Sequence, residues 1–220
     1  MSIRIQRFDE HQQMPWKNGL GITREVISRP ASDGSGGFDW RISLATVGAT
    51  GPFSIFPEID RTIAVLHGDG MQLTVDGRRE PPLLVGSPPF AFSGDAEVQA
   101  DCLGGETLDL NVMSRRGRFV HRMTKIDVSA AQTLSMSRDT VAIVFRGDAL
   151  VAVDSMRSEV GLGDIMISEQ VPFEFTVEPR AADCTLYSIE VTAALDRASE
   201  PEPVAWTRPL PIRECPMRCG

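Results

Sequence analysis

Short apolar stretches, rich in Val, Ile, Thr and Phe, follow one another along most of the chain. Gly, Pro and Asp separate them about every ten residues, a spacing typical of strands joined by turns. The stretches that predict strands are residues 39–47, 61–68, 71–77, 108–113, 140–147, 149–154 and 173–179. Only two segments, 129–136 and 191–198, have a pattern that favours helices. The chain is therefore predicted to be all-β, a barrel or sandwich with few short helices.

The strand pattern occurs twice, which indicates a duplicated β unit. Similar segments recur in the same order, at offsets of 78 to 83 residues along the chain. The matched segments are 62–77 with 140–155, 89–92 with 172–175, Cys102 with Cys184, and 109–112 with 188–191. Each copy is expected to contain a strand, a Gly-Asp turn, a second strand, a loop, a Pro-Phe strand and a closing strand.

The duplication predicts how the chain is divided. Residues 1–122 are expected to form an N-terminal barrel that carries the ligand pocket, and residues 123–200 a second barrel. Strands can be exchanged between two such copies when they pack against each other. The tail, residues 201–220, is expected to pack back on the first barrel through Trp206.

Composition and charge restrict the classes of partner. The 220 residues carry a formal net charge of −8, with 42% hydrophobic and 24% charged residues. This composition is typical of a globular protein, and the acidic balance disfavours broad binding to nucleic acid or to anionic membranes. The sequence contains neither a signal-peptide pattern nor an apolar run long enough to cross a bilayer. We therefore expect a cytoplasmic protein with no nucleic-acid or membrane partner.

The four cysteines agree with a reducing compartment. Cys102 and Cys184 lie in apolar, strand-like stretches and are expected to be buried thiols. Cys215 and Cys219 are close in sequence, but no second pair of Cys or His residues completes a four-ligand metal site. The cysteines therefore predict neither a disulfide framework nor a metal clip.

The first copy has the spacing of the cupin motif, in which a glycine precedes two histidines, a glutamate and a second glycine. Gly48 and Gly68 occupy the two glycine positions. The ligand positions hold Ser54, Phe56 and Arg61. These residues do not suit a divalent metal, because phenylalanine has no donor atom and arginine stays positively charged. The spacing therefore predicts a cupin barrel that has lost its metal.

The three histidines do not restore a metal site. His11, His67 and His121 have no ligand-like spacing, and each is interpreted as a turn or surface residue. We therefore predict no metal and no cofactor. If the barrel holds a ligand, arginine and amide groups are expected to hold it.

Two of the strands, 39–47 and 108–113, alternate between apolar and polar side chains. Their apolar faces hold Trp40, Ile42, Leu44, Leu108, Leu110 and Val112. Their opposite faces hold Arg41, Ser43, Ala45, Asp109, Asn111 and Met113. An ordinary β protein would turn the second set to solvent, whereas two packed barrels would enclose it around a cavity. In a cavity, pairing of arginine with carboxylate would offset the cost of burial, and the pattern leaves both interpretations open.

Four motifs together resemble the HutD/Ves family. These small bacterial proteins are associated with histidine-utilisation operons and, in the Ves branch, with a stress response. The motifs are PWKNGLGITREV (15–26), DWRISLATV (39–47), GPFSIFPEIDR (51–61) and DLNVMSRRG (109–117). The resemblance implies a bicupin fold without metal, and a cavity suited to a small carboxylate. It also implies a role as governor of histidine breakdown that senses an intermediate such as N-formylglutamate, or formate.

The chain departs from the family pattern at two positions. The family has three glycines after Asn18, whereas this chain has Leu20 in the middle. The family's FPG is FPE here, with Glu58. An added carboxylate near the mouth of a pocket is expected to weaken or redirect an anionic ligand.

The candidate ligand-binding residues combine donors, acceptors and an apolar wall. They are Lys17, Asn18, Thr23, Arg24, Arg41, Ser43, Phe53, Phe56, Arg61, Asp109, Asn111 and Met113. Arg24, Arg41 and Arg61 are expected to clamp an anion, since a guanidinium presents a planar fork of donors to a carboxylate. Trp16 is expected to pack rather than bind, and no catalytic residue is assigned.

Three functions remain open. The first is a non-enzymatic protein that binds a small anionic metabolite. The second is a metal-free cupin isomerase or hydrolase, with Asp109 as base and Arg41 as electrostatic stabiliser. The sequence offers no nucleophile–base dyad that would support an enzyme of this kind. The third is a regulator that contacts a protein partner, and a homodimer is compatible with all three.

Overall fold

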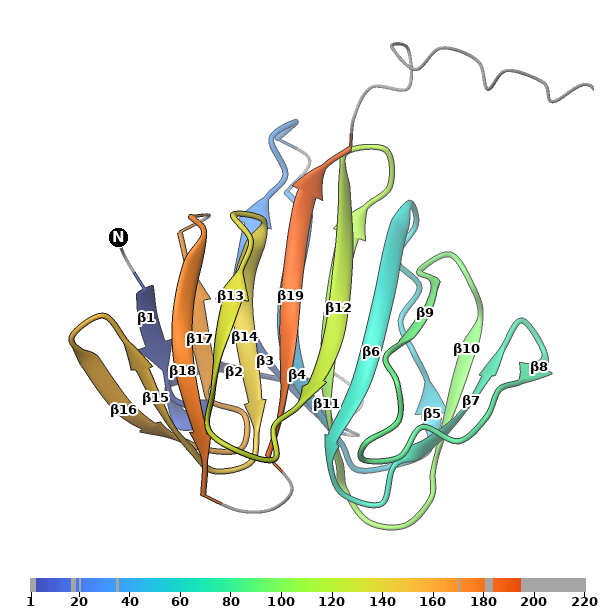
Figure 1. The fold of residues 1–220 in the computed structure, drawn as a ribbon. Coiled ribbons are helices and arrows are strands. Elements are labelled where there is room, and N and C mark those ends of the chain that lie inside the picture. The colour runs from blue at the N-terminus through green and yellow to red at the C-terminus, as the bar shows by residue number, and fades with distance from the viewer. Residues whose placement is uncertain are drawn as a thin grey trace, which may run out of the picture.

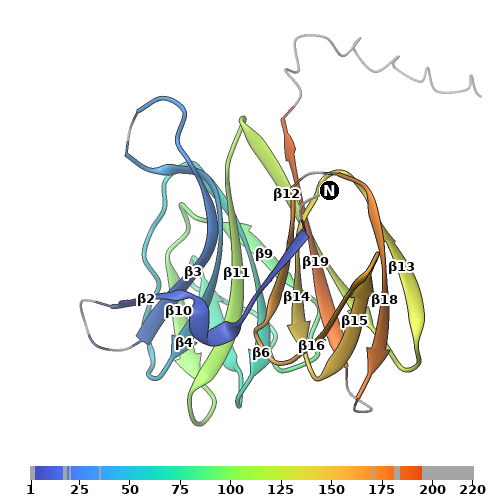
Figure 2. The same ribbon diagram turned by 90° about the vertical axis from the view of Figure 1, so that its left-hand side faces the viewer.

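The chain forms four antiparallel sheets stacked as layers (Figures 1 and 2). The computed structural model describes residues 3–16, 19, 21–34, 36–169, 171–180 and 184–194. The first inner sheet has the strand order β2 (Gln12–Pro15), β3 (Gly21–Pro30), β4 (Phe38–Val47), β11 (Thr107–Arg115), β6 (Ile59–His67) and β9 (Phe90–Ser93). The first outer sheet contains β5 (Gly51–Pro52), β10 (Val98–Cys102), β7 (Met71–Val75) and β8 (Arg78–Arg79). Together these two sheets make the first barrel.

The second barrel is built in the same way. Its inner sheet has the order β1 (Ile3–Gln6), β17 (Ile165–Ser168), β14 (Thr140–Arg146), β19 (Thr185–Ala193) and β12 (Phe119–Asp127). Its outer sheet contains β13 (Gln132–Met136), β18 (Phe173–Pro179), β15 (Ala149–Val153) and β16 (Met156–Val160). The order β4-β11-β6-β9 recurs as β12-β19-β14-β17, and β5-β10-β7-β8 recurs as β13-β18-β15-β16. The matching orders confirm the duplicated β unit.

One of the matched sequence pairs was assigned to the wrong strands. Residues 89–92 run into β9, in the first inner sheet, whereas 172–175 run into β18, in the second outer sheet. The counterpart of β18 in the first barrel is β10, because each pairs with the first strand of its unit's outer hairpin, β15 or β7. A Pro-Phe pair favours a strand start in either place, so local similarity did not identify the partner.

The two barrels share strands and a core. The strand β1 pairs with β17, from Ile3 opposite Ser168 to Gln6 opposite Ile165, so the first strand of the chain belongs to the second inner sheet. The strand β12 begins at Phe119 and pairs along its length with β19. The division of the chain at residue 122 stays a prediction, and the tail, 201–220, lies outside the described residues.

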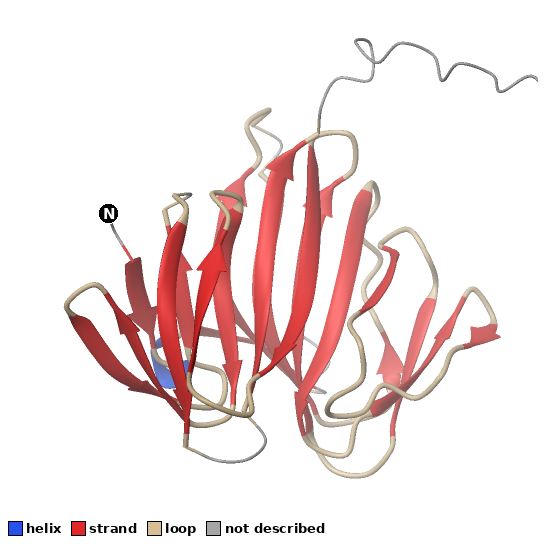
Figure 3. Ribbon diagram, in the orientation of Figure 1, coloured by secondary structure: helices blue, strands red, loops and turns tan. Residues whose placement is uncertain are grey.

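Both expected helices fall on strands where the structure describes them. Residues 132–136 form β13, because Leu134 and Met136 point into the core of the second barrel and the backbone pairs with β18. Residues 191–193 end β19, and 195–198 lie outside the described residues. The helical element in the described part of the chain is one 3-10 turn, η1 (Phe8–Glu10), coloured blue in Figure 3. Tertiary pairing overrode a weak helical preference in these segments.

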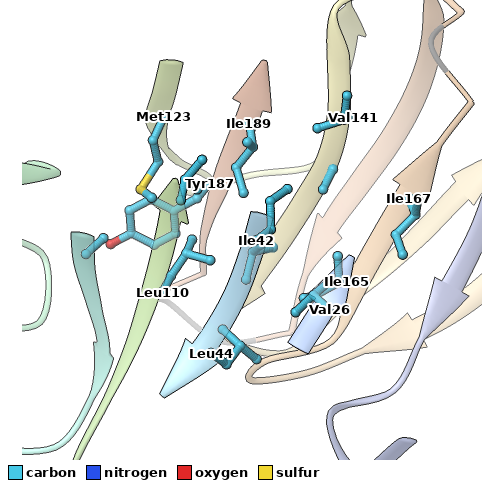
Figure 4. Packing of buried hydrophobic residues seen from close by; sticks show 14 of the residues in the cluster. Val26, Ile42, Leu44, Leu110, Met123, Val141, Ile165, Ile167, Tyr187 and Ile189 are labelled. Atoms are coloured by element: carbon cyan, nitrogen blue, oxygen red, sulfur yellow. The ribbon is translucent and has the colours of Figure 1, made fainter. Parts of the chain in front are cut away.

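Apolar side chains fill the space between the two inner sheets and form a central core (Figure 4). Trp40, Ile42 and Leu44 of β4 point into it, together with Tyr187 and Ile189 of β19. The alternation along β4 therefore sends Arg41, Ser43 and Ala45 to the other side of the sheet, toward the first outer sheet. The polar faces of β4 and β11 are enclosed, and the solvent-facing interpretation is wrong.

The loop from β5 to β6 contains a residue in an unfavourable backbone conformation. Glu58 has a φ of +60°, in the left-handed region that glycine adopts at no steric cost. Its side chain is exposed, and its N–H donates to Asp95 Oδ1 at 3.0 Å. The glycine of the family's FPG pattern would therefore suit this backbone better than glutamate does.

We expect Glu58→Gly to raise the free energy of unfolding by about 1 kcal/mol, because it removes the left-handed strain. For a chain of this size the midpoint of thermal unfolding should rise by about 2–4 °C. Thermal unfolding followed by circular dichroism measures the change. Glu58→Ala is the matched control, since it removes the carboxylate but keeps a Cβ, and it should give no gain. An equal gain in both variants would contradict the explanation.

Candidate ligand-binding site

A cavity of about 550 Å³ lies inside the first barrel, between its inner and outer sheets. Strands β4, β6 and β11 form its floor. Residues 14–16 and the loop after β5 form its wall. The lining residues are Met14, Pro15, Trp16, Thr23, Arg41, Ser43, Ala45, Pro52, Phe53, Ser54, Phe56, Arg61, Asp109, Asn111 and Met113. Beside the cavity, apolar side chains pack between the same two sheets and form an outer core, which includes Ile63, Met71 and Leu73. Apolar side chains also pack between the two sheets of the second barrel.

Arg61 lies on the cavity floor, on β6, and is surrounded by aromatic rings. Its residue is only 5% exposed, and its Cζ lies 4.8 Å from the ring centre of Phe92, 5.3 Å from Phe53 and 5.4 Å from Phe56. Its Nε has no hydrogen-bond partner, and Nη1 donates weakly to Ser54 O at 3.4 Å. Burial lowers the pKa of Arg61 to about 10, with Asp109 opposing this change. The side chain therefore stays charged at neutral pH.

Arg41 is half-buried and also lies against aromatic rings. Its Cζ lies 4.6 Å from the ring centre of Phe38 and 5.5 Å from that of Phe56, and Nη2 contacts Met113 Sδ at 3.4 Å. Its Nε has no partner. Burial lowers its pKa, and Glu25, which lies beyond ion-pair distance, acts in the opposite direction. Among the described residues, no carboxylate forms an ion pair with either of these guanidinium groups.

Acceptor groups lie on the same floor. Asp109 is 1% exposed, and Asn111, two residues along β11, is 6% exposed. The Oδ1 atoms of both lack a hydrogen-bond partner. Burial raises the pKa of Asp109 to about 7, and the charge of Arg61 acts against this rise. The cavity floor therefore carries two charged guanidinium groups and two acceptor atoms that have no hydrogen-bond partner among the described residues.

Nine of the twelve candidate residues line the cavity, as expected. They are Thr23, Arg41, Ser43, Phe53, Phe56, Arg61, Asp109, Asn111 and Met113. Lys17 and Asn18 lie outside the described residues, as does Leu20. The part that each plays in binding stays a prediction.

Arg24 does not join the other two arginines. Its Nη1 donates to Thr46 Oγ1 at 3.1 Å, and its Cζ lies 4.6 Å from the ring centre of Phe8, which packs against the central core. The reason is strand alternation: Thr23 points into the cavity, so its neighbour Arg24 must point to the opposite face. The expected clamp of three arginines is therefore a pair.

Sequence reasoning missed part of the wall. Met14, Pro15 and Trp16 come from β2 and the residue after it, since β2 pairs with β3 and sets Met14 opposite Thr23. Trp16 packs on the outer core as expected, but it also lines the cavity, and its Nε1 donates to Thr23 Oγ1 at 2.8 Å. Recognising 12–15 as a strand would have been the signal for these residues.

Not all of the histidines lie at the surface, contrary to the prediction. His11 is buried, with Nε2 3.4 Å from Gly163 O. His121 lies beside a second hollow, where Nε2 is 2.8 Å from Thr62 Oγ1 and Nδ1 is 2.7 Å from Ser114 Oγ. Burial lowers the pKa of both imidazoles. Both ring nitrogens of His121 are thus engaged in tying β12 to β6 and β11.

Within the described residues, no group of three or more His, Cys, Asp or Glu side chains is placed to hold a metal ion. In the same part of the chain, no helix is long and apolar enough to span a membrane. The cupin ligand positions at Ser54, Phe56 and Arg61 instead contribute to the cavity lining.

Relatives with similar sequences share most of the chain. An uncharacterised 21.2 kDa protein from the hutC 3′ region of Pseudomonas putida is 39% identical over 158 residues, covering 72% of this chain and 80% of the relative. Protein Ves of Citrobacter koseri is 38% identical over 134 residues, covering 60% of this chain and 67% of that protein.

Solved structures agree with this relationship. The structure of HutD from Pseudomonas fluorescens, described as a formate condition, has a TM-score of 0.73 at 32% identity and covers 88% of this chain and all of that one. Oxalate decarboxylase of Bacillus subtilis, a bicupin, has a TM-score of 0.56 at 8% identity, covering 86% and 78% of the two chains. This last likeness concerns the fold alone, and it confirms the predicted bicupin architecture. The HutD family model matches residues 8–185, and the chain belongs to the HutD family.

Proposed function

We propose that this protein binds a small carboxylate in the first-barrel cavity without transforming it. In this proposal the protein is a governor of histidine utilisation, and it senses an anionic intermediate such as N-formylglutamate, or formate. One observation carries the proposal: Arg41 and Arg61 face a cavity of about 550 Å³, and no carboxylate of the described residues forms an ion pair with either. A buried charge is costly unless it is paired, so a site of this kind suits an anion supplied from outside.

The acceptors narrow the class of ligand. Asp109 Oδ1 and Asn111 Oδ1 are both without a partner, and an amide N–H or a hydroxyl of the ligand would satisfy either. The apolar wall, with Phe53, Phe56 and Met113, suits the carbon chain of such a molecule. An N-acyl amino acid contains all three features: a carboxylate, an N–H donor and an aliphatic chain.

The relatives support the metabolic setting. The Pseudomonas putida protein is named for the hutC 3′ region, and the HutD structure from Pseudomonas fluorescens is described as a formate condition. The first name supports a setting in histidine utilisation, and the second description supports a small carboxylate as the ligand. The cytoplasm is the proposed compartment.

Titration calorimetry with formate and N-formylglutamate tests the proposal. We expect both to bind, and Arg41→Met to weaken binding by about 10- to 100-fold, because it removes a charged donor from a buried site. Arg24→Met is the matched control, since Arg24 lies on the opposite face of β3, and it should leave the affinity unchanged. Absence of heat for both ligands at millimolar concentration would contradict the proposed function.

The alternative is a metal-free cupin isomerase or hydrolase that acts on the same class of carboxylate. The observation that favours it is the pKa of Asp109, which burial raises to about 7, near that of an efficient general base. In that case Asp109 would remove a proton from the substrate while Arg41 stabilises the developing negative charge. Turnover of a bound carboxylate, seen by proton NMR and lost in Asp109→Asn, would replace the binding role by this one.

A further inference from the structure

Aromatic rings surround the two cavity arginines at positions where a buried arginine usually has a carboxylate. Arg41 has Phe38 and Phe56 within 5.5 Å of its Cζ, and Arg61 has Phe53, Phe56 and Phe92 within 5.4 Å. The face of an aromatic ring carries negative potential and attracts a cation. The rings thus stabilise the two positive charges without neutralising them. A carboxylate in the same place would neutralise them.

Phe56 is the ring that the two arginines share. Its centroid lies 5.5 Å from Arg41 Cζ and 5.4 Å from Arg61 Cζ. It also contacts Phe38, with ring centres 6.3 Å apart. Two guanidinium groups that face the same cavity repel each other in a poorly hydrated environment. A ring that attracts both reduces the cost of holding them close together.

Backbone contacts hold the loop that carries Phe56. Its N–H donates to Gly94 O at 2.8 Å, and its carbonyl accepts from Ile59 N at 3.3 Å. A Cβ at Gly94 would come within 2.6 Å of Phe56 O, so glycine is needed for this close approach. The loop is therefore anchored to the turn after β9, and the backbone of Phe56 is held by contacts within the protein.

We propose that Phe56 is a positioning residue for anion binding, which holds Arg41 and Arg61 charged, close together and unpaired. This inference rests on the proposed function and adds the means by which the site is kept ready. The attraction between the ring and both cations takes the place of a carboxylate at ion-pair distance, which would compete with the ligand. Asp109 acts on Arg61 only from beyond that distance. A side chain of similar volume without the negative ring face would fill the space but would let the guanidinium groups separate.

A series of fluorinated phenylalanines at position 56 separates these two roles. Added fluorine withdraws charge from the ring face while it changes the shape little. The affinity for formate, measured by calorimetry on the full chain, should fall stepwise with each added fluorine, by about 10-fold in total at trifluorophenylalanine. Phe56→Leu should weaken formate binding as much or more. Phe56→Trp keeps an aromatic face and should weaken formate binding less than Phe56→Leu does. The same analogues at Phe175, in the apolar core of the second barrel, are the control and should leave the affinity unchanged.

Two results would overturn the inference in different ways. If the unmodified protein binds formate and the fluorinated series at position 56 binds it equally well, the positioning role is wrong and the proposed function stands. If the unmodified protein binds neither formate nor N-formylglutamate, the proposed function is wrong and the positioning role falls with it. Unchanged thermal unfolding across the series shows that any loss of affinity comes from the ring's charge distribution and not from misfolding.

Discussion

Replacing Arg61 by methionine is expected to weaken formate binding by about 100-fold and, at the same time, to make the protein more stable by about 1 kcal/mol. Arg61 is 5% exposed and has no ion pair among the described residues, so the rings offset only part of the free-energy cost of its burial, and a bound anion would offset more. Methionine is close in volume and packs well against Phe53, Phe56 and Phe92. Loss of function with a gain of stability is characteristic of a group retained for binding.

Calorimetric titration with formate and urea unfolding at pH 7 measure the two effects of Arg61→Met. Arg180→Met is the control, because the exposed ion pairs of Arg180 with Glu159 and Glu178 contribute little to stability and lie in the second barrel. It should change neither quantity appreciably. A variant Arg61→Met that binds formate normally, or that is strongly destabilised, would show that Arg61 serves packing and not the ligand.

Asp109→Asn is expected to change how stability depends on pH. The pKa of Asp109 is about 7 in the folded protein, against an ordinary value of 3.8. The folded state therefore keeps a proton that the unfolded chain has released, and the free energy of unfolding falls as pH rises from about 4 to about 7. At 1.36 kcal/mol for each pKa unit, the total loss is on the order of 4 kcal/mol above pH 7. Asparagine does not titrate, so the variant should match the parent at pH 4 and exceed it at pH 8.

Urea unfolding of both proteins at a series of pH values checks this expectation, since other titrating groups cancel in the difference. Asp127→Asn is the contrasting control: hydrogen bonds from Lys125 and Thr185 lower the pKa of its exposed carboxyl. Its contribution has the opposite sign and is lost as pH falls. The ionised Asp109 also repels an anion, so formate affinity should decrease above pH 7 in the parent only. A constant stability difference between parent and Asp109→Asn across pH would contradict the raised pKa.

The sequence predicted correctly which side chains share a face within a single strand. The alternation along β4 and β11 separates the central core from the cavity floor, and the structure places Arg41, Asp109 and Asn111 on the predicted shared face. The same rule, applied to adjacent residues, would have excluded Arg24 once Thr23 was assigned to the cavity. The remaining errors concern pairing between distant segments. Whether 90–93 joins an inner or an outer sheet depends on its partner β6, which the local residues do not identify.

The exchange of β1 constrains how this chain can be made. Ile3 to Gln6 are synthesised before their partner, residues 165–168 of β17, which follow more than 150 residues later in the chain. Until then the opening segment has an unsatisfied strand edge, and the second inner sheet cannot be completed. We therefore expect β1 to be added late, as the strand that completes the second inner sheet after β17 has been made. A circular permutant that joins this segment directly to the second barrel should fold faster than the natural order of the chain.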